Sequence, residues 1–121
     1  MFYIRNAGNA KAAMSKEAHF TFVKQCETYI QQLKAKEQLI AAQPIMPEGK
    51  ILSKDETGWL LNTVGDSTDV QVGYYHIIAA DMEEAIAIAK LNPEFSFVPS
   101  ASIEIRQVKT KETSTNFVYP K

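Results

Sequence analysis

The chain is poor in the residues that mark several large classes of protein. Its 121 residues include one cysteine, Cys26, which has no second cysteine for an internal disulfide, so we expect a reducing, cytoplasmic location. Thirteen Lys and Arg against fourteen Asp and Glu give a net charge of −1, which excludes the broad basic surface that binds nucleic acid. No apolar run approaches the roughly 20 residues of a membrane span, and the first residues lack the basic-then-apolar order of a signal peptide.

Motifs for bound cofactors are also missing. No Cys/His spacing matches a zinc site, no acidic loop matches a calcium site, and the five glycines are too scattered for a phosphate-binding loop. We therefore expect no metal and no cofactor. The remaining composition, 45% hydrophobic and 22% charged, is that of an ordinary folded domain. We expect one domain over residues 1–108 and a tail over residues 109–121 that is mobile or docked on a dimer.

Hydrophobic periodicity predicts both helices and strands. From Ser15 to about Leu39, apolar side chains recur every three or four residues, as on one face of a helix, with Ser15 as the N-cap. Asp81 is expected to cap a second helix, with Glu84 completing a capping box and Asn92-Pro93 ending the helix. Strands are expected at Phe2–Arg5, Ile51–Lys54, Trp59–Val64, Val70–Ala80 and Ser102–Val108, with loops at Asn6–Ala13, Gln43–Gly49 and Gly65–Asp69.

The order of these elements predicts an α+β fold. When the first strand of the hairpin is set aside, the order is β-α-β-β-α-β, the ferredoxin-like arrangement with one extra hairpin strand. In that arrangement the first strand of the sheet lies between the third and the fourth.

Several segments resemble the YCII-related family in its DGPF-type branch. They are Gln38–Leu52, Val72–Asp81 with Glu83–Lys90 and Asn92-Pro93, and Ser102–Val108. The Asp-Gly-Pro-Phe signature itself is not retained, because its position falls on Asn62-Thr63-Val64-Gly65. Neither His19 nor His76 matches the histidine–aspartate pair proposed as an active site in the YCII branch. The resemblance implies a dimeric α+β barrel, in which two sheets pack face to face, but no defined biochemical role.

The strands themselves predict a second buried face. Both alternating sets of Val70–Ala80 are largely apolar, and so are both sides of Trp59-Leu60-Leu61, as in strands buried on both faces. Two helices cover only one face of a four-stranded sheet. The other face would measure roughly 19 Å by 17 Å, about 300 Å², and an apolar patch of this size usually marks an interface. We therefore expect a homodimer, with Trp59 in the core.

Alternation alone leaves open which strand residues face the helices. Phe2 and Ile4 are expected to face them in the first strand. In the longest strand, Tyr75 favours one phase, whereas Val70 and Val72 favour the reverse.

With Tyr75 facing the helices, five side chains converge on the opposite face. They are Arg5, Tyr74, His76, Glu104 and Arg106. His76 beside Glu104 has the chemistry of a general base, and Arg5 and Arg106 that of a clamp for a small anionic molecule, with Tyr74 also lining the pocket. Alternatively, Glu104 and Arg106 form an ion pair that sets the register of the dimer, and Tyr74 and its neighbours fill the interface of a non-catalytic accessory protein. The residues do not decide whether the protein is an enzyme.

Overall fold

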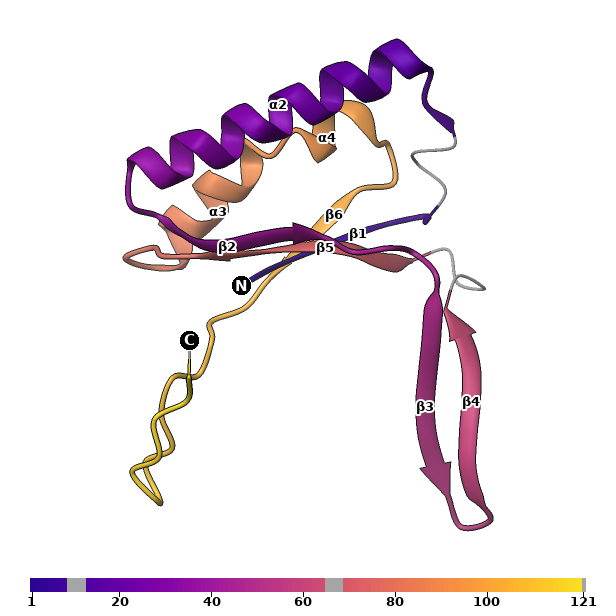
Figure 1. Cartoon of the computed structure of the whole chain (residues 1–121). Coiled ribbons are helices and arrows are strands. Elements are labelled where there is room, and N and C mark those ends of the chain that lie inside the picture. The colour runs from indigo at the N-terminus through magenta and orange to yellow at the C-terminus, as the bar shows by residue number, and fades with distance from the viewer. Residues whose placement is uncertain (9–12, 65–68, 121) are drawn as a thin grey trace.

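The computed structural model describes residues 1–8, 13–64 and 69–120 (Figure 1). The fold is mixed α+β, and every strand pairing among these residues is antiparallel. The elements in chain order are β1 (Phe2–Asn6), α2 (Lys16–Ala35), β2 (Leu39–Pro44), β3 (Gly49–Asp55), β4 (Gly58–Val64), β5 (Val70–Ile77), α3 (Met82–Lys90), α4 (Glu94–Phe97) and β6 (Ser102–Ile105). Residues 9–12 and 65–68, which belong to two of the expected loops, lie outside the described residues.

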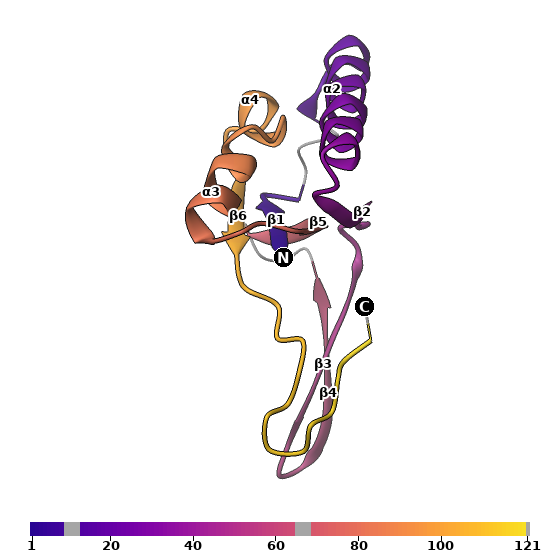
Figure 2. The same cartoon turned by 90° about the vertical axis from the view of Figure 1, so that its left-hand side faces the viewer.

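A four-stranded sheet forms the centre of the molecule. Its order is β2-β5-β1-β6, so β1 lies between β5 and β6, where we expected the first strand. The helices α2, α3 and α4 all lie over one face of this sheet (Figures 1 and 2). We call the opposite side, which carries no helix among the described residues, the helix-free face.

The edge strand β2 was not predicted. The first helix was expected to continue to about Leu39, but α2 ends at Ala35, and Glu37 turns the chain with a φ of 57°. Residues Leu39–Pro44 then form β2, where a proline is tolerated because the strand lies at the edge. A short apolar run after a helix is not distinguished from more helix by periodicity alone.

The predicted hairpin forms, but it does not belong to the central sheet. Strands β3 and β4 pair only with each other, as a separate two-stranded sheet. The expectation that Trp59–Val64 would supply a strand of the main sheet is therefore wrong, because β2 occupies that place beside β5.

Both predicted helix caps are confirmed. The Ser15 hydroxyl accepts a hydrogen bond from the backbone N–H of Ala18 at 3.1 Å, and the Asp81 carboxylate accepts one from the N–H of Glu84 at 2.8 Å. The Glu84 carboxylate accepts the N–H of Ala80 at 3.4 Å, one residue before the position a capping box requires. The helices therefore begin where local side-chain chemistry directs them to.

The short helix α4 was not predicted. It begins immediately after Pro93, a residue tolerated at a helix start, and the Asn92 side chain accepts a hydrogen bond from the N–H of Glu94 at 2.9 Å. The flanking strands are shorter than expected, since β5 ends at Ile77 and β6 ends at Ile105.

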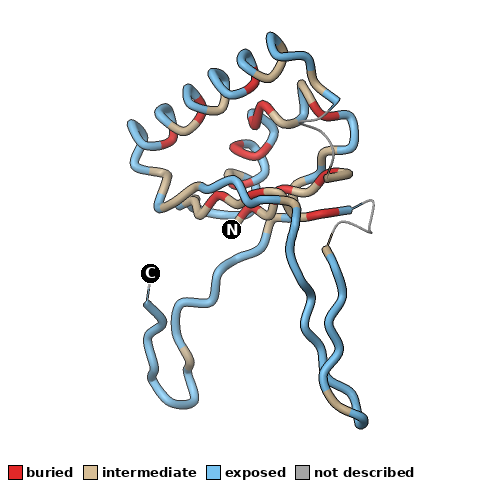
Figure 3. Tube along the Cα trace, turned by 45° about the vertical axis from the view of Figure 1, so that its right-hand side comes forward, coloured by how far each residue is buried: buried red, intermediate tan, exposed pale blue. Residues whose placement is uncertain are grey.

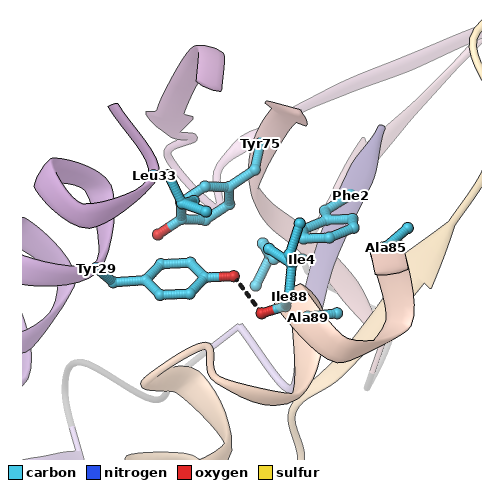
Figure 4. Close-up of a cluster of buried hydrophobic side chains, with 8 residues drawn as sticks. All are labelled: Phe2, Ile4, Tyr29, Leu33, Tyr75, Ala85, Ile88 and Ala89. Carbon is cyan, nitrogen blue, oxygen red and sulfur yellow. Dashed lines mark hydrogen bonds between the residues drawn. The ribbon is translucent and has the colours of Figure 1, made fainter. Parts of the chain in front are cut away.

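The core lies between the helices and the sheet (Figures 3 and 4). Its members are Phe2, Ile4, Tyr29, Leu33, Tyr75, Ala85, Ile88 and Ala89. The Tyr29 hydroxyl donates a hydrogen bond to the Ile88 carbonyl at 2.7 Å, and its ring meets that of Tyr75 edge to face with centroids 5.5 Å apart. These contacts join α2 to α3 and to the central sheet.

Two segments project from the helix-free side (Figures 1 and 2). The hairpin arm, Gly49–Val64, leaves the sheet where β2 ends and β5 begins, and the tail arm, residues 109–120, leaves at the opposite end, beyond β6. Trp59, expected in the core, is 69% exposed because the hairpin arm points away from the sheet. The tail arm folds back on itself through a bridge between Lys111 and Val118.

Candidate functional site

The burial of strand residues agrees with the orientation that the predicted site requires, in which Tyr75 faces the helices and His76 faces away from them. Phe2 is 0% exposed, and both it and Tyr75 belong to the core beneath the helices. Side chains alternate along a strand. Arg5, Tyr74 and His76 therefore lie on the helix-free face, as the favoured phase predicted.

A β-bulge explains why Val70 and Val72 favoured the reverse phase. The pairing of β1 with β5 shifts by one residue between Ile4 and Arg5, and Val72 is the extra residue of β5. The extra residue reverses the alternation, so that Val70 and Tyr75 are both buried although an odd number of positions separates them.

Three predicted residues of the site form a chain of ion pairs. Nε of Arg5 lies 3.6 Å from one oxygen of Glu104, and Nη1 of Arg106 lies 3.8 Å from the other. Arg5 also approaches Asp69 at 3.9 Å. These separations exceed the roughly 2.7–2.9 Å of a charge-assisted hydrogen bond, and the side chains of Arg5 and Arg106 are 32% and 69% exposed. Each pair contributes only about 0–1 kcal/mol, so an incoming anion can displace Glu104 at low cost.

His76 and Glu104 are not in contact within one chain. Tyr74 lies opposite Tyr3, and Tyr3 lies opposite Glu104, so the whole of β1 separates β5 from β6. Two strand spacings amount to roughly 10 Å, beyond hydrogen-bond reach. The expected His76–Glu104 pair therefore does not form within the chain.

Tyr3 is a further residue of this face that was not predicted. It lies between Tyr74 and Glu104 on the helix-free face, and its position two residues before Arg5 was the signal that could have found it. We refer to Tyr3, Arg5, Tyr74, His76, Glu104 and Arg106 as the polar cluster. With these residues, the helix-free face is polar and aromatic, which corrects the apolar patch expected from the strands.

A hollow of about 380 Å³ brings His76 and Arg106 together. It lies at the end of the sheet where β1 begins and extends to the start of α3. Its apolar lining includes Phe2, Ile78 and Ala85, and Asp81 also borders it. The volume falls in the range of small-molecule pockets, and a few polar groups in an apolar wall are their usual composition.

A second cavity, of about 310 Å³, lies on the other side of the sheet, beside α2. Phe22, Ile30 and Val98 contribute to its largely apolar wall, with Cys26 and Glu94 among the remaining lining residues. Burial, with a smaller effect from the Glu94 carboxylate, raises the pKa of the Cys26 thiol to about 12. The thiol is therefore protonated at neutral pH, so Cys26 packs as a small apolar side chain and is not a candidate nucleophile.

The chain was compared with models of protein families and with curated protein sequences. No protein-family model matches the chain, and no curated protein sequence matches it. Among the described residues, no three His, Cys, Asp or Glu side chains are grouped so that they could hold a metal ion. No helix in the described part of the chain is long and apolar enough to cross a membrane. Of the positions where the DGPF signature would fall, Asn62-Thr63-Val64 end β4, and Gly65 lies outside the described residues.

Proposed function

We propose that this protein is a homodimer that binds a small anionic molecule in a pocket between two facing sheets, without a cofactor. The observation that carries this proposal is the placement of His76 and Arg106, whose side chains belong to the polar cluster on the helix-free face and also line the hollow at the end of the sheet. Arg5 and Glu104 extend the same polar cluster along the helix-free face. The loose ion pairs support it further, because a carboxylate or phosphate can replace Glu104 on the guanidinium groups and form shorter, bidentate hydrogen bonds.

The same proposal includes the ferredoxin-like arrangement and the dimeric α+β barrel of the YCII-related family, in its DGPF-type branch. The order β2-β5-β1-β6 with antiparallel pairing supports it once the hairpin arm is set aside. The segments quoted for the resemblance support it too, although the DGPF signature is not retained. The single free cysteine, Cys26, supports a cytoplasmic location.

The proposed dimer would also bring the two candidate catalytic residues, His76 and Glu104, close to each other. Face-to-face sheets lie about 10 Å apart, close enough for side chains from the two chains to interdigitate. His76 of one chain and the partner's Glu104 can then approach each other across the two-fold axis, which a single chain does not allow. In this arrangement His76 would act as a general base, or as a hydrogen-bond donor if the pocket only binds.

Anion binding by matched variants tests the pocket. We expect inorganic phosphate or succinate to bind the full chain, as measured by calorimetry, and Arg106→Gln to weaken binding about 10- to 100-fold through the loss of a charge-assisted hydrogen bond. Lys34→Gln, which removes a cation from α2 on the helix side, is the control and should leave binding unchanged. Equal binding by the two variants would refute the pocket.

His76→Ala separates the pocket from the interface. Loss of phosphate binding by an intact dimer supports the proposal, whereas loss of the dimer alone counts against it. Native mass spectrometry of protein purified gently from its own source gives an independent result. A dimer that carries extra non-covalent mass supports the pocket and identifies its ligand.

A second candidate function is an accessory or interaction protein whose interface is filled by its own side chains. The pairing of Tyr3 directly opposite Tyr74 favours it, because two large rings lie on the helix-free face. This alternative would be supported by a dimer whose mass equals that of two chains without a ligand and which binds neither phosphate nor succinate.

A further inference from the structure

The hairpin arm exposes five large apolar side chains. Ile51, Leu52, Trp59, Leu60 and Leu61 are each between 45% and 69% exposed. The pairing of β3 with β4 places Leu52 opposite Leu61, so these two share one face of the arm with Trp59. Among the described elements, β3 and β4 have substantial contacts only with each other. A lone two-stranded hairpin is marginally stable in water, so the arm needs a surface to pack against.

The position of the arm indicates where that surface lies. The arm projects from the helix-free side, and the tail arm projects from the same side at the other end of the strands (Figures 1 and 2). A strand of seven residues, as β3 and β4 are, spans roughly 24 Å. A second sheet on the helix-free face would lie only about 10 Å away. The arm is therefore long enough to pass the partner's sheet and reach the layer behind it.

The area available for a dimer interface also favours a contact between the hairpin arm and the partner. The helix-free face offers about 300 Å² per chain in projection, whereas a standard stable interface buries about 800 Å² per partner. One face of the hairpin arm adds roughly 24 Å by 10 Å, or about 240 Å². The arm therefore nearly doubles the projected area that the sheet alone offers, along the border of the same interface.

We infer that the hairpin arm clasps the second copy of this chain, with Trp59, Leu52 and Leu61 packed on the partner. The inference rests on the proposed dimer and adds its second contact surface.

Trp59 is the only tryptophan of the chain and therefore reports directly on the arm. Sedimentation equilibrium gives the mass of the full chain, and acrylamide quenching of the tryptophan fluorescence gives the exposure of Trp59 over the same concentrations. We expect a dimer in which Trp59 is protected, and quenching that increases as dilution produces monomer.

A matched pair of variants locates the contact. Leu52→Ser combined with Leu61→Ser should raise the dimer dissociation constant at least roughly 100-fold, because two large apolar side chains lose their burial. Leu91→Ser, at a residue that is 72% exposed beside α3, should leave it unchanged. Circular dichroism checks that the central domain of each variant is folded.

Each other result overturns the inference in a recognisable way. A dimer with freely quenched Trp59, unaffected by the double variant, would refute the clasp and leave the proposed dimer standing. A monomer at every concentration would refute both the clasp and the dimer. A monomer with protected Trp59 would mean that the arm folds onto its own sheet, which also refutes the clasp.

Discussion

The hydrogen bond between Tyr29 and Ile88 allows a quantitative test of the core. Tyr29→Phe removes the hydroxyl that donates to the Ile88 carbonyl at 2.7 Å and keeps the ring that packs against Tyr75. Removing the donor of a buried acceptor lowers the free energy of unfolding by about 1–3 kcal/mol. The Ile88 carbonyl also accepts the N–H of Leu91 at 3.2 Å, so it keeps one donor in the variant. We therefore expect the free energy of unfolding to fall by about 1 kcal/mol, at the lower end of that range.

Urea unfolding at one fixed protein concentration measures this change, because a dimer would make the midpoint depend on concentration. The corresponding decrease in Tm is roughly 3–6 °C for a chain of this length. Tyr119→Phe is the control, since its hydroxyl bonds Glu112 on the exposed tail arm and its loss should change stability by less than about 0.5 kcal/mol. If Tyr29→Phe were as stable as the wild-type chain, the bond would not join α2 to α3 as argued.

Gly73→Ala should destabilise the chain by roughly 1–3 kcal/mol, because a Cβ at that position would lie 3.1 Å from the backbone carbonyl oxygen of Gln43. Gly49→Ala, whose Cβ would meet only the Val64 side chain at 3.7 Å, is the control, and equal urea midpoints for the two variants would contradict the prediction. Cys26 should react with iodoacetamide at least roughly tenfold more slowly in the folded chain than in urea, because burial raises its pKa from 9.0 to about 12 and so lowers the thiolate fraction; equal rates would contradict that rise. The folded chain keeps a thiol proton that the unfolded chain releases above pH 9, so the free energy of unfolding should fall as pH rises from 9 to 12. Urea midpoints along that range measure the fall, and Cys26→Ala should reduce its slope.

Features with a local physical cause were predictable from the sequence. Ser15 and Asp81 cap their helices because a short polar side chain before an apolar repeat satisfies free backbone N–H groups. The turn residue Gly58, with a φ of 134°, closes the hairpin for an equally local reason. Arg5 and Glu104 share one face of the sheet because they alternate with core residues.

Features that depend on distant partners were not predictable. Leu39–Pro44 becomes a strand because the edge of β5 is available to it, not because of its own composition. The extra residue at Val72 looks like ordinary alternation until β1 is placed beside it. His76 and Glu104 lie on one face of the sheet as expected, but they do not meet, because alternation contains no information on the number of strands that separate two residues. The exposure of Trp59 depends on a hairpin that leaves its own domain.

The central position of β1 has a consequence for the synthesis of the chain. Phe2 pairs with both Tyr75 and Ile105, so the first strand stays without its two neighbours until β5 and β6 have left the ribosome. At about 5–20 residues per second, the second neighbour follows roughly 5–20 seconds after the first strand. During this interval Phe2 and Ile4, which become buried in the folded domain, are open to chaperones and to other nascent chains. Folding that depends on such distant pairing is slow to begin, so the yield of native protein should depend on what protects this segment while the rest of the chain is made.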